Sequence, residues 1–228
     1  MIWLCGDTHG TLDLQKVEDY YENLSCYQEV SKNDYLIILG DVGVCWDGGI
    51  NDAYVISCLQ NLPCTVLWLD GNHENFDIIE EYPVVSNWNG GKVQFIAQDV
   101  IHLMRGQVYE LDGKSFFVFG GGNSIDKQWR TPGVSWWENE MPSEQEYEEG
   151  LQNLEKLDYT VDYVLTHTCP GHIAHMLVSD VYSGEEELQN YFDDISQKVD
   201  FVGWYFGHWH MDWMEGEYQC LWDDIVAL

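Results

Sequence analysis

Basic residues are scarce in this sequence. Its 228 residues include 40 Asp and Glu but only 9 Lys and Arg, so the formal net charge is −31 at pH 7. This charge repels nucleic acids and anionic membranes within a screening length of about 8 Å. We therefore expect neither a nucleic-acid polymer nor a membrane as partner, although a local positive site remains compatible with the composition.

Other features are also missing. No run of about 18 apolar residues occurs, so we expect no membrane-spanning helix. The seven Cys form no C-x-x-C pair, which argues against zinc-knuckle and thioredoxin signatures, and several lie in apolar runs. The chain opens without a basic region followed by an apolar stretch. We expect a cytoplasmic protein in a reducing compartment, and nothing in the sequence indicates an obligate protein partner.

Five short apolar runs each lead into residues of metal-binding types. The residues that follow these runs are Asp7 and His9, Asp41, Asn72 and His73, His167, and His208 and His210. Short aromatic and β-branched runs that end in Gly are typical of buried strands. In an open α/β sheet, ligands gather beyond the carboxyl ends of the strands. We therefore expect these side chains to form one shell of oxygen and imidazole donors.

The first part of the chain alternates between strand and helix patterns, which is typical of parallel strands joined by helical crossovers. The expected elements, in chain order from a strand, are 2–5, 11–24, 35–39, 50–61, 64–69 and 74–81. Closely spaced strand patterns follow and predict a second, more antiparallel sheet with a hairpin turn at Asp112-Gly113. They cover 93–96, 101–104, 108–111 and 115–119.

The rest of the chain begins with an irregular segment, residues 120–142, which is rich in Gly and Trp. Ser143 and Glu146 then form a capping box that opens a helix to about Leu157. Further strands are expected over 161–166, 200–206 and 218–228, with a helix over 185–197. No linker or repeat divides the sequence, so we expect a single domain over residues 1–228.

In this order, the five motifs resemble those of the calcineurin-like metallophosphoesterase superfamily. The family pattern is D-x-H, G-D, G-N-H-[DE], a His after a strand, and G-H-x-H. The chain matches it with Asp7-Thr8-His9, Gly40-Asp41, Gly71-Asn72-His73-Glu74, His167 and Gly207-His208-Trp209-His210. One such motif would say little, but five ordered motifs are specific. The resemblance implies an α/β fold, a two-sheet β-sandwich of mixed strands flanked by helices, that holds two divalent metal ions.

The resemblance also implies how the ligands divide and how they would act. One ion would be held by Asp7, His9, Asp41 and His210, and the other by Asp41, Asn72, His167 and His208. A hydroxide that bridges the ions would attack phosphorus in line. His73 would contact the phosphate and protonate the leaving oxygen, so we expect His73, Asn72 and Asp41 to be catalytic. Imidazole and carboxylate ligands suit Mn, Fe or Zn, and Ni or Co also fit.

Differences from the sequence pattern of the Ser/Thr protein phosphatases limit the class of substrate that we expect. Those enzymes carry phosphate-clamping Arg residues shortly after G-D and just before G-N-H-E. Here Val42 follows Asp41, and the acidic Asp70, which would repel phosphate, precedes Gly71. We therefore expect a small soluble phosphate mono- or diester as substrate. A Ser/Thr protein phosphatase-like activity and a non-catalytic metal-binding scaffold remain as alternatives.

The 120–142 segment carries the candidate substrate-binding residues Arg130, Lys127 and Trp129. Its Gly-Gly-x-Ser-x-Asp stretch, followed by Arg, resembles a bacterial and phage-associated branch of the superfamily. The alternative is a surface loop whose Trp residues simply pack. Outside the motifs, we expect Glu74 to cap the helix that follows it, and three other His residues to serve packing or the surface: His102, His172 and His175.

Overall fold

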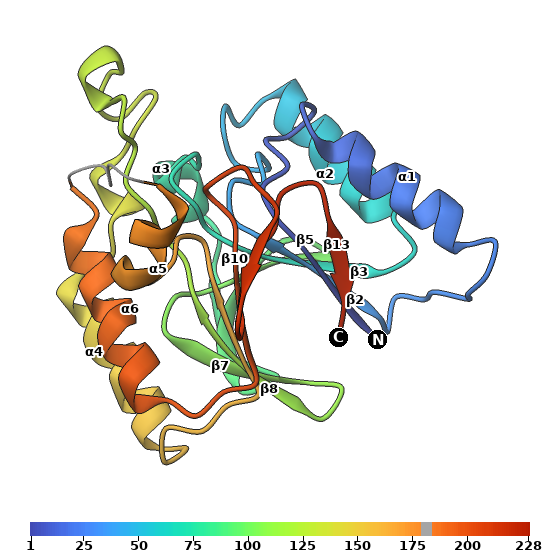
Figure 1. Ribbon diagram of the computed structural model, residues 1–228. Helices are drawn as coiled ribbons and strands as arrows, with labels where there is room; N and C mark the ends of the chain where they lie inside the picture. Colours follow the sequence, from blue (N-terminus) through green and yellow to red (C-terminus); the bar gives the residue numbers. More distant parts are fainter. Residues whose placement is uncertain (179–183) are drawn as a thin grey trace.

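The computed structural model describes residues 1–178 and 184–228 (Figure 1). Within this part of the chain, two mixed sheets form, and helices lie on the outer side of each (Figure 1). The first sheet has seven strands in the order β13-β1-β2-β3-β6-β5-β4. Its strands are β1 Ile2–Cys5, β2 Tyr35–Leu39, β3 Thr65–Leu69, β4 Val84–Trp88, β5 Gly91–Ala97, β6 Val100–Leu103 and β13 Ile225–Ala227.

The second sheet has, among the described residues, six strands in the order β11-β12-β10-β9-β8-β7. They are β7 Gln107–Leu111, β8 Lys114–Phe119, β9 Tyr163–Thr166, β10 Gly203–Phe206, β11 Trp213–Glu215 and β12 Tyr218–Cys220. The helices are α1 Leu14–Leu24, α2 Ile50–Asn61, α3 Phe76–Ile79, α4 Glu144–Glu155, α5 Gly171–Leu177 and α6 Glu186–Lys198, with short 3-10 turns η1 Lys127–Trp129 and η2 Glu138–Glu140.

Three apolar layers hold the molecule together, because the strands bury both faces. Along β1, Trp3 packs in the layer that also contains residues of α1 and α2. The next residue, Leu4, belongs to the layer between the two sheets. On the second sheet, Phe117 belongs to a third layer with residues of α4, α5 and α6. The order is therefore helix, sheet, sheet, helix, as the family resemblance implied.

The expected pattern lacked β4, α5 and β11, placed α3 over the longer range 74–81, and needs four further corrections. Helix α1 begins at Leu14 rather than at residue 11, because residues 9–13 form a turn in which the Leu12 and Asp13 N–H groups donate back to the carbonyl oxygens of His9 and Thr8. Strands β5 and β6 extend the first sheet instead of building the second, since β6 pairs with β3 in parallel. The strand expected over 218–228 is two strands in different sheets. The carboxylate of Asp212 accepts the backbone N–H groups of residues 222–224 and so ends the first of them.

The fourth correction concerns Glu74, which does not cap α3. Asn75 takes that place, because its side chain accepts the Ile78 N–H. Glu74 is fully buried, and its two carboxylate oxygens accept the N–H groups of Val42 and Gly71. It therefore ties together the loops that follow β2 and β3.

Other expectations are confirmed. Strands β1, β2 and β3 pair in parallel, and Asp112 and Gly113 form the β7–β8 turn with φ of 51° and 74°. The capping box of Ser143 and Glu146 opens α4. The carboxyl ends of β1, β2 and β3, and of β9 and β10 in the second sheet, each lead into one of the five motifs. Within residues 1–178 and 184–228, no helix has the length and apolar character needed to cross a bilayer.

Candidate metal centre

The loops after β1 and β10 bring three donors together. His9 Nε2 lies 3.0 Å from His210 Nε2. Both face the buried carboxylate of Asp7, whose Oδ2 lies 3.1 Å from His210 Nε2 and 3.8 Å from His9 Nε2. His9 Nε2 also lies 3.9 Å from Asp41 Oδ2. These four side chains are the set expected for one ion.

A second group forms around His167, which is fully buried. Its Nδ1 donates to the carbonyl oxygen of Leu39 at 2.7 Å, which leaves Nε2 as the nitrogen that faces the cluster. Nε2 lies 3.1 Å from Asn72 Oδ1 and 3.5 Å from Asp41 Oδ1. The Asn72 amide is held in this orientation because its Nδ2 donates to Ser124 Oγ at 3.2 Å.

His208 stands beside this second group. Its ring centroid lies 4.9 Å from that of His167. On its other side, His208 Nε2 lies 3.5 Å from Oε1 of Glu185, which is buried. The Glu185 carboxylate also accepts the Asn123 N–H, the Thr168 hydroxyl and the Gln189 amide, each at 2.9 Å. Glu185 therefore joins the loops after β8 and β9 to the start of α6.

The backbone at the cluster is unusual, because four of its residues have left-handed conformations. The φ values are 44° for His9, 50° for Asp41, 68° for His208 and 49° for His210. Such residues cost on the order of 1–3 kcal/mol each and persist only where the surroundings fix them. Here backbone hydrogen bonds do so: the His208 N–H donates to Asp7, and the His73 N–H donates to Asp41 Oδ1.

Glycines of the motifs allow the loops to approach the donors closely. A Cβ on Gly71 would lie 2.1 Å from Asp41 Oδ1, and a Cβ on Gly40 would lie 2.1 Å from His167 Nδ1. Any other residue would therefore push a donor out of the cluster.

The buried carboxylates of Asp7 and Asp41 repel each other when both are ionised. Burial raises the pKa of Asp41 to about 6, and the nearby charge of Asp7 adds to this shift. Burial acts on Asp7 in the same direction, but the contacts with His210, His167 and the His208 N–H outweigh it and hold the Asp7 pKa below its usual range. A cation between the carboxylates would remove their mutual repulsion.

The donor set fits divalent metal ions. His167 Nε2 lies close to Asn72 Oδ1 and Asp41 Oδ1, so an imidazole nitrogen, an amide oxygen and a carboxylate oxygen meet at one point. All three are ligand types that bind divalent metal ions. Two sets of carboxylate and imidazole donors have ligand atoms within 4.8 Å of one another: Asp7, His9 and His210, and Asp7, Asp41 and His167.

Arg130 reaches this cluster from the 120–142 segment. Its Nη1 lies 3.1 Å from His73 Nδ1, its Nη2 lies 3.3 Å from His73 Nε2, and its Nε lies 2.7 Å from Asp126 Oδ1. Burial, and then the charge of Arg130, lower the pKa of His73 to about 3. A pocket of about 460 Å³ opens here, with Arg130 and His73 in its wall beside Asp41, Asn72, His208 and His210.

The two other candidate substrate residues lie elsewhere. The Lys127 ammonium pairs with the buried carboxylate of Glu140 and donates to Asn123 Oδ1 at 2.6 Å. The Trp129 side chain is 83% exposed. Neither lines the pocket that contains Arg130. Another Trp of the segment does pack: Trp137 is buried, and its indole donates to Asp77.

Asp70, the acid before Gly71, does not present an unpaired charge to the pocket that contains Arg130. It is buried, and its carboxylate contacts Arg105 Nε at 2.7 Å and His102 Nε2 at 3.2 Å. Arg105 also donates to the carbonyl oxygens of Asn139 and Glu140. The expected repulsion of phosphate by Asp70 is therefore wrong, and His102 packs inside the protein as part of this network.

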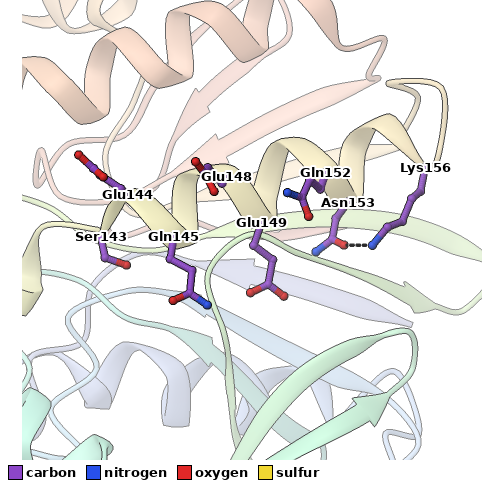
Figure 2. A pocket seen from close by; sticks show the side chains of 8 residues that line it. All are labelled: Ser143, Glu144, Gln145, Glu148, Glu149, Gln152, Asn153 and Lys156. Carbon is purple, nitrogen blue, oxygen red and sulfur yellow. Dashed lines mark hydrogen bonds between the residues drawn. The ribbon is translucent and has the colours of Figure 1, made fainter.

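A larger pocket lies away from the cluster. It has a volume of about 850 Å³ and runs along α4, where Figure 2 shows the polar side chains that project from this helix. None of the expected site residues lines it. Its lining is mostly Glu, Gln and Asn, which offers no chemistry for a phosphate ester.

Sequence reasoning missed Glu185 and the roles of Ser124 and Glu74. Ser124 holds Asn72, and its own Oγ donates to Glu140 Oε2 at 2.9 Å. The signal for Ser124 was its place in the Gly-Gly-x-Ser-x-Asp stretch. Glu185 carried no signal, because an acid at the start of an expected helix is ordinary.

Comparison with known proteins agrees with this arrangement. A family model for calcineurin-like phosphoesterases matches residues 1–212. The structure is similar to phosphopantetheinyl hydrolase from Mycobacterium tuberculosis, with 20% identity, a TM-score of 0.51, and coverage of 97% of this chain and 89% of that chain. It is also similar to a protein from Thermus thermophilus, with 12% identity, a TM-score of 0.52, and coverage of 97% and 87%.

No curated protein matches the sequence significantly. At these identities the two solved structures show a shared fold and no more. The family model, however, spans the five motifs from Asp7 to His210. The chain therefore belongs to the calcineurin-like phosphoesterase family and is a metal-dependent phosphoric ester hydrolase.

Proposed function

We propose that this chain is a dinuclear metal-dependent phosphoesterase that hydrolyses small soluble phosphate mono- or diesters. The observation that carries the proposal is the gathering of imidazole, amide and carboxylate donors at the buried Asp7 and Asp41, with Asn72 Oδ1 and Asp41 Oδ1 lying 3.1 and 3.5 Å from His167 Nε2. Asp7, His9, Asp41 and His210 would hold one ion, and Asp41, Asn72, His167 and His208 the other. Mn, Fe or Zn suit these donors.

When bound, two divalent ions would supply positive charge for the phosphate and lower the pKa of water enough to give a nucleophile at neutral pH. The protein's own residues do the rest. Asp41 would hold both ions, and Asn72 would fix the second through its amide oxygen. Arg130 would grip phosphate oxygens bidentately, which its planar guanidinium permits. His73, next to Arg130, would give a proton to the leaving oxygen.

The electrostatics favour a small substrate. The net charge of −31 opposes the approach of an anionic polymer, whereas the metal ions and Arg130 give a local positive site. Arg105 would not serve as a phosphate clamp of the protein-phosphatase kind, because it is already paired with Asp70, which leaves Arg130 as the one Arg of the sequence for the phosphate. All seven Cys lie in described parts of the chain with free thiols, which supports action in the reducing cytoplasm.

Hydrolysis of two chromogenic esters tests the proposal. We expect the protein, freed of metal by a chelator, to be inactive, and Mn²⁺ to restore release of p-nitrophenol from p-nitrophenyl phosphate, bis-p-nitrophenyl phosphate, or both. The ratio of the two rates would decide between a monoesterase and a diesterase. Equal, low release with and without metal would overturn the proposal and favour a non-catalytic scaffold.

A further inference from the structure

A second hollow adjoins the cluster and, unlike the pocket with Arg130, has no cationic side chain among its described lining residues. Its volume is about 310 Å³, and His9 and His73 form part of its wall. The remaining wall is largely apolar, with Leu12, Trp46 and Val55. His73 therefore lines both pockets, and only one of them also has Arg130 in its wall.

Close packing of two glycines shapes this hollow on the side of the first two motifs. Gly10 and Gly43 both line it. A Cβ on Gly43 would lie 2.4 Å from the Gly10 backbone nitrogen, so the two loops meet there without side chains. This arrangement leaves open space next to His9, whose ring lies 5.4 Å from that of His73.

The charges around the hollow disfavour an anion. No Lys or Arg is among its described lining residues. Its one acid, Asp52, is buried, and its Oδ2 accepts the N–H groups of Trp46, Asp47 and Gly48 at 2.8 to 3.1 Å. A negative group placed here would therefore find no positive partner, while a flat or apolar group would find the Trp46 ring, whose centroid lies 6.5 Å from that of His73.

We infer that this hollow receives the leaving group of the substrate, and that the leaving group is an uncharged alcohol with an aromatic or apolar body. The inference rests on the proposed function. In hydrolysis the phosphorus–oxygen bond of the ester breaks, the oxygen of water stays on phosphorus, and the alcohol oxygen takes a proton. With the phosphate on the side of Arg130, the alcohol oxygen lies by His73 and its carbon body enters the hollow.

Two aryl phosphates test this preference. Phenyl phosphate and 3-carboxyphenyl phosphate release phenols of closely similar pKa, so they differ mainly in the added negative charge. At about 0.15 M salt, which screens the overall charge beyond about 8 Å, we expect kcat/KM to be at least tenfold higher for phenyl phosphate. The Leu12→Lys variant should narrow this ratio by about fivefold, the effect of one exposed ion pair of about 1 kcal/mol.

Control variants separate an effect at this hollow from a loss of stability and from a general effect of added positive charge. Leu12 is 78% exposed, so Leu12→Lys should keep its melting temperature. Val202→Lys adds the same charge at a residue that is 68% exposed and precedes β10, at the end of the strand opposite the cluster, and it should leave the ratio unchanged. For Trp46→Ala, the loss of kcat/KM should be at least tenfold larger with phenyl phosphate than with acetyl phosphate, which has no ring.

The outcomes are distinct. The inference would be overturned if the wild-type protein hydrolysed phenyl phosphate and 3-carboxyphenyl phosphate with nearly equal kcat/KM. It would also be overturned if Leu12→Lys and Val202→Lys changed the ratio of these two values equally. In both cases the protein would still hydrolyse phosphate esters. Absence of hydrolysis of every ester at every metal concentration would instead overturn the proposed function.

Discussion

The guanidinium of Arg130 lies against the imidazole of His73, with Nη1 3.1 Å from Nδ1 and Nη2 3.3 Å from Nε2. A neutral imidazole has one acceptor nitrogen, so at most one of these contacts is a hydrogen bond. The contact keeps a positive charge on the face of the residue that we expect to act as the acid. A phosphate that draws Arg130 toward itself would free His73 to hold a proton, which links substrate binding to catalysis.

Arg130→Ala should therefore raise KM at least tenfold, while metal content and melting temperature stay close to wild type. Arg130→Lys should recover only part of the affinity, because an ammonium does not bind phosphate bidentately. Steady-state kinetics with p-nitrophenyl phosphate measure both, and Lys198→Ala, at an exposed residue of α6, controls for loss of charge. If Arg130→Ala melts much earlier and KM holds, Arg130 is a structural partner of Asp126.

His73→Asn should keep both metal ions but lower turnover by about 10² to 10⁴, the usual effect of removing a general acid. The loss should shrink for esters with leaving groups of low pKa, because these need no proton. A series of aryl phosphates measures this trend, with His172→Asn, outside the cluster, as the matched control. A loss that is the same for good and poor leaving groups would show that His73 only positions the phosphate.

Asp41→Asn should cost more activity than any other ligand substitution, because Asp41 serves both proposed ions. In the metal-free protein, by contrast, we expect the same substitution to stabilise the fold. The pKa of Asp41 is raised to about 6, above its usual value of about 3.9, so ionisation lowers the free energy of unfolding as pH rises through about 6. With chelator at pH 8, Asp41→Asn should therefore melt at a higher temperature than wild type. A lower melting temperature under these conditions would contradict this assignment.

Glu185→Gln should weaken metal binding by about 10- to 100-fold, the usual effect of losing a group that supports a ligand, while leaving the fold intact. Glu185 lies 3.5 Å from His208 and fixes the loops around it. Isothermal titration calorimetry with Mn²⁺ measures this change in metal affinity without any substrate. Glu187→Gln removes the same charge from an exposed residue of α6 and should bind metal as wild type does. Equal affinities for Glu185→Gln and wild type would remove Glu185 from the site.

Asp70→Asn should lower the free energy of unfolding by up to about 3–5 kcal/mol, because it removes the buried partner of Arg105 and leaves that charge only Glu146, at 3.5 Å. Although burial opposes it, the charge of Arg105 and the contact with His102 hold the pKa of Asp70 below its usual range. The stabilisation is thus present above about pH 4 and is lost as pH falls toward the lower folded pKa. Urea unfolding at pH 7 and pH 3 should show a smaller difference between wild type and variant at pH 3. An unchanged difference would contradict the ion pair.

Much of the site could be predicted because it is local in sequence. Each motif directly follows its strand, so finding the strand also located the donors, as with Asp7 after β1 and Asp41 after β2. Parallel pairing of β1, β2 and β3 then brought these ends to one edge. The family pattern supplied the contribution of the second sheet, which strand patterns alone did not order.

What sequence reasoning missed depends on contacts between distant segments. Glu185 approaches His208 across the fold, and Arg105 reaches Asp70 over 35 positions. Whether a strand such as β6 joins the first or the second sheet is likewise decided by its partner, β3, and not by its own residues. The same holds for Lys127, whose partner Glu140 has no local signature.

Stoichiometric titration of the metal-free protein with Mn²⁺ tests the central claim most directly. Bound metal and the rate of p-nitrophenyl phosphate hydrolysis would be followed on the same samples. The account predicts that two ions bind to each chain and that hydrolysis reaches its full rate only as the second site fills. Full activity at one ion per chain, or two bound ions without hydrolysis of any phosphate ester, would contradict it.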